Sequence, residues 1–135
     1  MLKELKVVAG ILVWNNKILC VQKGKVRYDY LSFKYEFPGG KIEAGESPGQ
    51  ALSRELQEEL LIEVEVKEEN YFQTVEYQYP DFHLEMRAYV CELQDPTISL
   101  NEHIQYLWCE PEDLRELDWA PADWPIVEGL EQRGV

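Results

Sequence analysis

The stretch that most constrains this chain runs from Glu36 to Val64 and reads EFPGGKIEAGESPGQALSRELQEELLIEV. Its pattern predicts a short strand, a turn at Gly39-Gly40, a second turn near Gly45 and then a helix. Residues suited to a helix start come next: Ser47, Pro48 and Gln50. Apolar residues at helical spacing then predict a core-facing side: Ala51, Leu52, Leu56 and Leu60.

The same helix carries three glutamates, Glu55, Glu58 and Glu59, whose spacing places them on one side. Like charges at this spacing destabilise a helix, so a cation is expected to offset them. Magnesium fits, because it takes oxygen ligands such as carboxylates. The alternative is a solvated acidic face, since the chain carries 26 Asp and Glu and a formal net charge of −13.

Six residues of this stretch form the pattern G-x5-E-x7-R-E-L-x-E-E: Gly40, Glu46, Arg54, Glu55, Glu58 and Glu59. The pattern resembles the Nudix box, and the flanking EFPGGKIE resembles MutT-type Nudix hydrolases in particular. The resemblance extends over nearly the whole chain. It implies a Nudix-type α/β/α sandwich around a mixed sheet, and hydrolysis of nucleoside triphosphates.

The resemblance also implies a metal site built from these ligands: the Gly39 carbonyl, Glu55, Glu58, Glu59 and Glu102. Glu102 enters because it lies six residues before Trp108, as in the MutT pattern. Mg²⁺ is the expected ion and Mn²⁺ the alternative, while either Glu55 or Glu102 would be the general base. Arg54 would orient the carboxylates, Glu46 would support the loop, and two lysines would hold phosphate oxygens: Lys23 and Lys41.

Asp123, within the segment PADWP, matches the position at which MutT-type enzymes read the base edge. An ionised carboxylate only accepts hydrogen bonds, so Asp123 would favour an amino group over a carbonyl unless it is protonated. The alternative role is a helix N-cap. Candidates to stack on the base are aromatic: Phe33, Tyr35, Tyr77 and Tyr79. The two histidines, His83 and His103, have no metal-ligand spacing and receive no role.

The function implied is Mg²⁺-dependent release of pyrophosphate from modified nucleoside triphosphates such as 8-oxo-dGTP, as antimutator enzymes do. Alternatives within the family are a CTP or 5-methyl-dCTP pyrophosphohydrolase and a hydrolase of another diphosphate such as ADP-ribose. A non-catalytic nucleotide-sensing domain is the alternative of another class. The complete set of box carboxylates disfavours that reading, because such domains commonly lose them.

The remaining segments predict a single domain over residues 1–135, with strands near 6–14, 17–22, 62–66, 71–79, 82–93 and 104–109 and further helices at 111–117 and 121–132. Leu61 stands where the family usually has the glycine that ends the box helix. A left-handed leucine costs about 1 kcal/mol, so we expect the helix to end differently.

The composition of the chain limits the cellular compartments and the binding partners that we expect for the protein. Three cysteines in apolar runs predict buried thiols and a cytoplasmic protein: Cys20, Cys91 and Cys109. There is no signal-peptide pattern and no apolar run of about 18 residues, which disfavours a membrane partner. The negative charge disfavours direct binding to nucleic acid. We expect a monomer or a homodimer that binds a small nucleotide.

Overall fold

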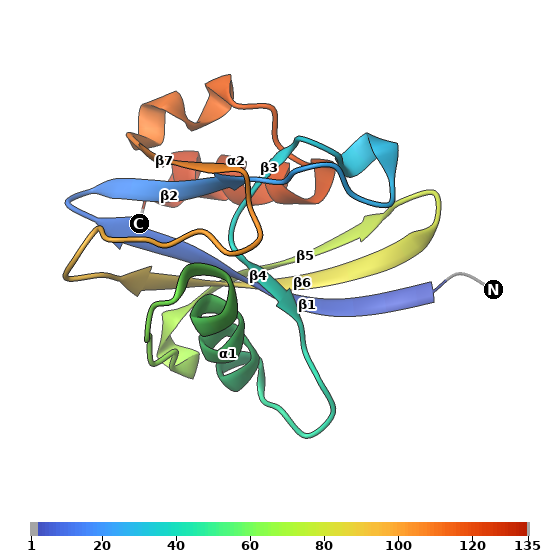
Figure 1. Cartoon of the computed structure of the whole chain (residues 1–135), viewed down its shortest axis with the longest axis horizontal. Coiled ribbons are helices and arrows are strands. Elements are labelled where there is room, and N and C mark those ends of the chain that lie inside the picture. The colour runs from blue at the N-terminus through green and yellow to red at the C-terminus, as the bar shows by residue number, and fades with distance from the viewer. Residues whose placement is uncertain (1–2, 135) are drawn as a thin grey trace.

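The computed structural model describes residues 3–134, which form a mixed sheet with a helix on each side (Figure 1). Over these residues the sheet has seven strands: β1 (Lys3–Trp14), β2 (Lys17–Gln22), β3 (Tyr35–Glu36), β4 (Gly39–Lys41), β5 (Tyr71–Gln78), β6 (Phe82–Glu92) and β7 (Gln105–Cys109). The two α-helices are α1 (Pro48–Leu60) and α2 (Trp124–Arg133). Short 3-10 helices span Asp29–Leu31, Glu68–Asn70, Pro111–Glu116 and Pro121–Asp123.

Strand β1 is the centre of the sheet. It runs parallel to β6 and antiparallel to β2 and β4. The strands of the sheet follow the order β3-β2-β1-β6-β5, and two further strands lie off this path: β4 pairs with β1, and β7 pairs with β2. Two hairpins join strands that are consecutive in sequence, one between β1 and β2 and the other between β5 and β6. The first turns at Asn15 and Asn16, whose φ angles of 51° and 63° suit a tight hairpin turn.

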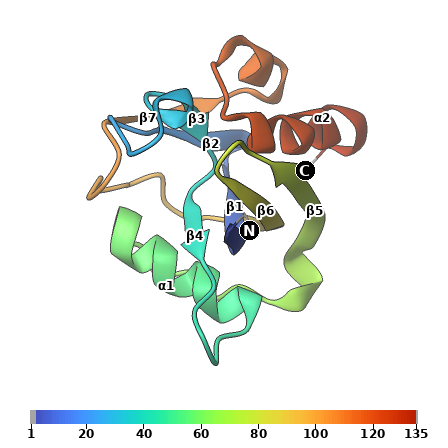
Figure 2. The same ribbon diagram turned by 90° about the vertical axis from the view of Figure 1, so that its right-hand side faces the viewer.

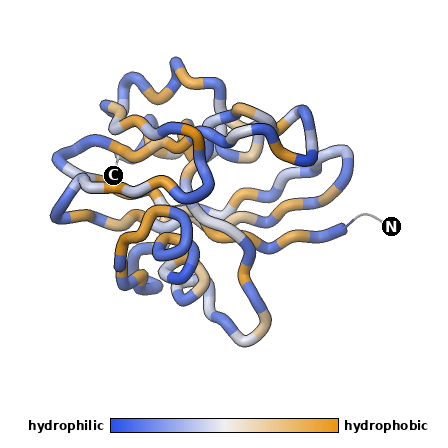
Figure 3. The backbone as a smooth tube through the Cα atoms, in the orientation of Figure 1, coloured by the Kyte–Doolittle hydropathy of each residue, from blue (hydrophilic) through white to orange (hydrophobic). Residues whose placement is uncertain are grey.

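Both faces of β1 are buried from Val8 to Val13, which explains the unbroken run of uncharged, mostly apolar residues in this part of the strand (Figure 3). Ile11 and Val13 belong to the core beneath α2, whereas Val8 and Leu12 belong to the core beneath α1. Figure 2 shows the two helices on opposite sides of the sheet. The predicted α/β/α sandwich is therefore confirmed.

Gly39 and Gly40 do not form the predicted turn, and that prediction was wrong. They lie in β4, paired with Ala9 and Val8 of β1. A Cβ on Gly39 would lie 1.9 Å from the Val8 carbonyl oxygen. The lack of a side chain at Gly39 thus allows β4 to lie close to β1, and these glycines do not reverse the chain. The second predicted turn is present at Gly45, which has a φ of 84°.

Two other segments differ from the sequence prediction. Residues 62–66 alternate in burial as expected but pair with no strand in the described chain. They lie along α1, where the Ser53 hydroxyl donates to the Val64 carbonyl at 2.6 Å. The expected helix at 111–117 is a 3-10 helix. The one expected at 121–132 begins as a 3-10 turn before α2.

The start of α1 follows the sequence prediction. The Ser47 side chain accepts from the Gln50 backbone N–H at 3.2 Å, and the Gln50 side chain accepts from the Ser47 N–H at 2.9 Å. The predicted core-facing residues are buried: Ala51, Leu52, Leu56 and Leu60. The C-terminus of α1 does not follow the prediction that this helix would end without a left-handed residue. Leu61 itself adopts the left-handed conformation, with φ 55° and ψ 40°.

Replacing Leu61 by glycine should raise the free energy of unfolding by about 1 kcal/mol. Leu61 is 58% exposed, so little packing is lost, and glycine removes the cost of a left-handed Cβ. Urea denaturation would measure the change. Gly134, which already has a positive φ, offers a reference position where alanine should destabilise. A Leu61→Gly protein less stable than the original would contradict the prediction.

The three cysteines are free thiols, with Cys20 and Cys91 buried and Cys109 half-buried. Among the helices of residues 3–134, none combines the length and apolar character that a membrane crossing requires.

Candidate active site

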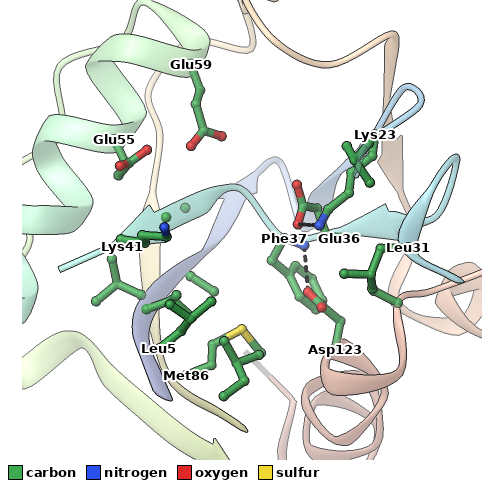
Figure 4. A pocket seen from close by; sticks show the side chains of 18 of the residues that line it. Leu5, Lys23, Leu31, Glu36, Phe37, Lys41, Glu55, Glu59, Met86 and Asp123 are labelled. Atoms are coloured by element: carbon green, nitrogen blue, oxygen red, sulfur yellow. Dashed lines mark hydrogen bonds and ion pairs between the residues drawn. The ribbon is translucent and has the colours of Figure 1, made fainter. Parts of the chain in front are cut away.

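A cavity of about 460 Å³ opens between α1, the central strands and the segment before α2 (Figure 4). One end is acidic and is lined by Glu55, Glu59 and Glu102. The other end is apolar, and its walls include Leu5, Leu31, Phe82, Leu84 and Met86. The cavity therefore joins a charged end to an end suited to a flat or apolar group.

Three of the predicted metal ligands come together at the acidic end. Carboxylate oxygens of Glu55, Glu59 and Glu102 lie within 4.8 Å of one another. Helix α1 supplies the first two. The loop before β7 supplies the third and is fastened to α1 by Asn101, which donates from its backbone to the Glu59 carbonyl and from its side chain to the Glu58 carbonyl, both at 3.0 Å.

Glu59 is the most buried member of this group, with only 3% of the residue exposed. Its Oε1 has no hydrogen-bond partner within residues 3–134. Burial first, and then the hydrogen bond and charges of nearby carboxylates, raise the pKa of Glu59 to about 10 in the metal-free protein. Three carboxylates with an unpartnered buried oxygen form a donor set that fits a divalent cation.

Arg54 holds the cluster from the side. Its guanidinium donates to both Glu46 oxygens at 2.7 and 2.9 Å and to Glu55 Oε1 at 2.9 Å. The hydrogen bonds from Arg54 lower the pKa of Glu46 to about 2. Glu58 Oε1 lies 3.2 Å from the same guanidinium, and its side chain is 56% exposed, outside the group of three. This placement suits orientation by Arg54 and support by Glu46.

The remaining site glycines and lysines line the cavity: Gly39, Gly40, Lys23 and Lys41. Gly40 leaves the space that the Glu55 carboxylate fills, since a Cβ there would lie 2.4 Å from Glu55 Cδ. Lys23 Nζ lies 3.3 Å from Glu36 Oε1. Both lysines thus line the same cavity as the carboxylate cluster.

Asp123 lies at the other end of the cavity and is only 5% exposed. Its Oδ2 accepts the Phe37 backbone N–H at 3.0 Å, as the dashed line in Figure 4 shows. Burial, followed by the charge of Glu36, raises the pKa of Asp123 to about 8. Its side chain makes no capping hydrogen bond to α2, so the helix-cap alternative does not hold.

Of the four aromatic residues predicted to stack on the base, only one lines the cavity. Tyr79 lines the cavity, and its hydroxyl accepts the Ala122 backbone N–H at 2.9 Å. Tyr77 packs against Tyr79, with ring centroids 4.7 Å apart, and is not part of the cavity lining. Phe33 is exposed and Tyr35 is buried against Trp119, so neither lines the cavity.

Sequence reasoning missed His103 and Glu36. Both line the cavity, and His103 Nε2 lies 2.9 Å from Glu36 Oε2. His103 directly follows Glu102 in the chain, which is the one local signal that pointed to it.

The family model described as "NUDIX domain" matches residues 4–130 of this chain. The chain belongs to the Nudix family. It is 36% identical over 129 residues to the CTP pyrophosphohydrolase of Escherichia coli (strain K12), covering 96% of this chain and 93% of that protein. It is 30% identical over 131 residues to the 8-oxo-dGTP diphosphatase of the same strain, covering 97% and 99%.

A relative of known structure has the same fold. The solution structure of the Escherichia coli ORF135 protein superposes with a TM-score of 0.80 and 34% identity, covering 97% of this chain and 91% of that one. The chain is a Nudix nucleoside triphosphate pyrophosphohydrolase, an enzyme rather than the non-catalytic sensor considered above. Enzymes of this family typically use a divalent metal, and the Glu55, Glu59 and Glu102 cluster fits one.

Proposed function

We propose that this enzyme hydrolyses modified nucleoside triphosphates such as 8-oxo-dGTP to the monophosphate and pyrophosphate, and so cleanses the nucleotide pool of a cytoplasmic compartment. The observation that carries the proposal is the cavity itself, with three carboxylates at one end and buried Asp123 at the other. A triphosphate would lie at the acidic end and its base at the apolar end. We propose Mg²⁺ as the ion, with Mn²⁺ as the alternative.

The chemistry requires charge neutralisation and a positioned water. A bound divalent ion would neutralise phosphate oxygens beside Glu55, Glu59 and Glu102. Lys23 and Lys41 bind further phosphate oxygens, and Arg54 keeps Glu55 oriented through its 2.9 Å hydrogen bond. Glu55 or Glu102 accepts the proton of the water that attacks the β-phosphorus, and the bond to the α-phosphate oxygen breaks.

Asp123 reads the base in this proposal. One of its oxygens is taken by the Phe37 N–H, which leaves Oδ1 for the ligand. With a pKa of about 8, the carboxyl is largely protonated at pH 7. Its O–H then donates to a base carbonyl, as an asparagine amide would. A protonated Asp123 is therefore compatible with the carbonyl edge of guanine derivatives, which an ionised carboxylate would repel.

A second candidate is a CTP pyrophosphohydrolase. The 36% identity to the Escherichia coli CTP pyrophosphohydrolase favours it. Its base would meet Asp123 through an amino group, which suits the ionised carboxylate above pH 8.

The Asp123→Asn variant distinguishes how the base is read. For the original protein, kcat/KM on 8-oxo-dGTP should fall by about tenfold between pH 7 and 9, because Asp123 loses its donor, while kcat/KM on CTP should not fall with it. The ratio of the two values cancels effects of pH on the chemical step. In the Asn variant this ratio should stay constant with pH. A ratio with the same pH profile in both proteins would remove Asp123 from base recognition.

A screen of normal and modified triphosphates, CTP, 5-methyl-dCTP and ADP-ribose, with and without Mg²⁺, tests the proposed reaction. Chromatography of the products should show a monophosphate and pyrophosphate in equal amounts, with the highest kcat/KM for a modified purine triphosphate. The highest value for CTP would establish the second candidate instead. Release of inorganic phosphate alone would overturn the reaction proposed here.

A further inference from the structure

His103 and Glu59 face each other at the inner end of the acidic cluster. His103 Nδ1 lies 3.9 Å from Glu59 Oε1, and both side chains are about 95% buried, with 5% and 4% exposed. Neither atom has a hydrogen-bond partner among residues 3–134. Buried polar atoms are nearly always satisfied, so two unpartnered ones that face each other indicate a missing group between them.

The other ring nitrogen shows what kind of group this is. Nε2 lies 2.9 Å from Glu36 Oε2, and a carboxylate only accepts, so Nε2 carries the proton. Glu36 is held in turn by Lys23, 3.3 Å from its other oxygen. In the neutral ring Nδ1 then presents a lone pair to the Glu59 carboxylate. Two facing buried acceptors are satisfied when a positive charge lies between them: a proton on Glu59 in the metal-free protein, in keeping with its raised pKa, or a metal ion that replaces this proton.

The arrangement matches that of metal-binding histidines. Such a histidine typically donates its second N–H to a carboxylate, which fixes the tautomer and aims the free nitrogen at the metal. Bonds to an imidazole nitrogen and a carboxylate oxygen are each about 2.0–2.2 Å long, so two donor atoms of one tetrahedral ion lie about 3.3 to 3.6 Å apart. The observed separation of 3.9 Å is only slightly larger, so a small movement of the two side chains would bring both atoms onto one ion.

We propose that His103 Nδ1 and Glu59 Oε1 form a cation subsite with a nitrogen donor, adjoining the all-carboxylate group of Glu55, Glu59 and Glu102. Imidazole suits transition metals, whereas Mg²⁺ takes oxygen ligands. The subsite therefore selects Co²⁺ or Zn²⁺ over Mg²⁺. As a site in the same cavity it rests on the proposed function for its use in catalysis, though not for its binding of metal.

The chain offers a direct test because it contains only two histidines, His83 and His103. Proton–nitrogen correlation spectra of the imidazoles, recorded during titration with Zn²⁺ and no nucleotide, report on both rings. We expect His103 to show a protonated Nε2 and a bare Nδ1 without metal, and its Nδ1 resonance to shift with Zn²⁺. His83 serves as the internal reference, since its side chain is 30% exposed on β6 and lies beside Glu76. An unchanged His103 Nδ1 at saturating Zn²⁺ overturns the proposal, as does a ring doubly protonated with and without metal.

Binding measurements give a second, independent result. Titration of Co²⁺ into His103→Gln, followed by its visible absorption and by calorimetry, should give a Kd at least about tenfold weaker than in the original protein. The Kd for Mg²⁺ should change less than about threefold. His83→Gln, the same change away from the cavity, should bind both ions as the original protein does. Equal losses for Co²⁺ and Mg²⁺ in His103→Gln would indicate a structural role and overturn the proposal.

The two proposals fail separately. A protein that binds Zn²⁺ through His103 but releases no pyrophosphate from any triphosphate would contradict the proposed function and leave the subsite intact. A protein that hydrolyses triphosphates but whose His103 Nδ1 resonance does not change with Zn²⁺ would contradict the proposed subsite alone.

Discussion

Replacing Glu59 by glutamine should lower metal-dependent pyrophosphate release by about 100-fold or more. Glu59 contributes the most buried oxygens of the cluster, and loss of even an outer partner of a metal ligand commonly costs about 10- to 100-fold. Steady-state kinetics at saturating Mg²⁺ would measure the change. Glu63→Gln, which changes an exposed acid just beyond α1, is the matched control and should keep full activity.

The same variant has an opposite effect on stability, which separates catalysis from folding. In the metal-free protein the pKa of Glu59 is raised from 4.5 to about 10, so the folded state retains a proton that the unfolded state loses above pH 4.5. Stability of the original protein should therefore fall as pH rises from about 5 towards 10. Glu59→Gln lacks this loss and should be the more stable protein at pH 8 without metal.

Thermal unfolding with a chelator, and then with added Mg²⁺, completes the test. Metal should stabilise the original protein much more than the variant, because a ligand that binds the folded state raises its apparent stability. Near-normal turnover by Glu59→Gln would remove Glu59 from the metal site. Equal stabilisation of both proteins by Mg²⁺ would place the ion elsewhere.

Local patterns predicted the elements of this fold because their causes are local. The capping residues of α1, its apolar side and the paired asparagines between β1 and β2 each act within a few residues of their position in sequence. The alternation at 62–66 misled for the same reason. It reports burial of every second side chain, and burial against α1 produces the same pattern as burial in a sheet.

The residues of the site could be predicted only where the pattern of the family gives the number of residues between a site residue and another recognisable position. Glu102 could be placed beside α1 by its distance from Trp108, and it lies there. The contact of His103 with Glu36 joins residues 67 positions apart, and no spacing rule links them. The protonation of Asp123 depends on burial by the rest of the chain. Sequence alone could name that residue without giving its charge.

Alanine at Gly39 should destabilise the protein by about 3 kcal/mol or more, the upper part of the range for an overpacked site. Its Cβ would lie 1.9 Å from the Val8 oxygen and 2.9 Å from the Ala9 Cα, both backbone atoms of β1. These backbone atoms of β1 are held by the sheet and cannot move away by rotation about a single bond, as a side chain can. Relief requires β4 to separate from β1, which would weaken the β1–β4 pairing. Urea denaturation of the metal-free protein would measure this loss.

Gly40→Ala is the matched comparison, because the same methyl group meets a different kind of neighbour one residue along. Its Cβ would lie 2.4 to 2.6 Å from the carboxylate atoms of Glu55, the free end of a flexible side chain. Glu55 can swing away at little cost in stability, under about 1 kcal/mol, but it then leaves Arg54 and the metal site. Gly40→Ala should therefore fold normally and lose activity, whereas Gly39→Ala should lose stability first. The reverse order would mean that the carboxylate cluster, rather than the approach of β4 to β1, requires glycine at position 39.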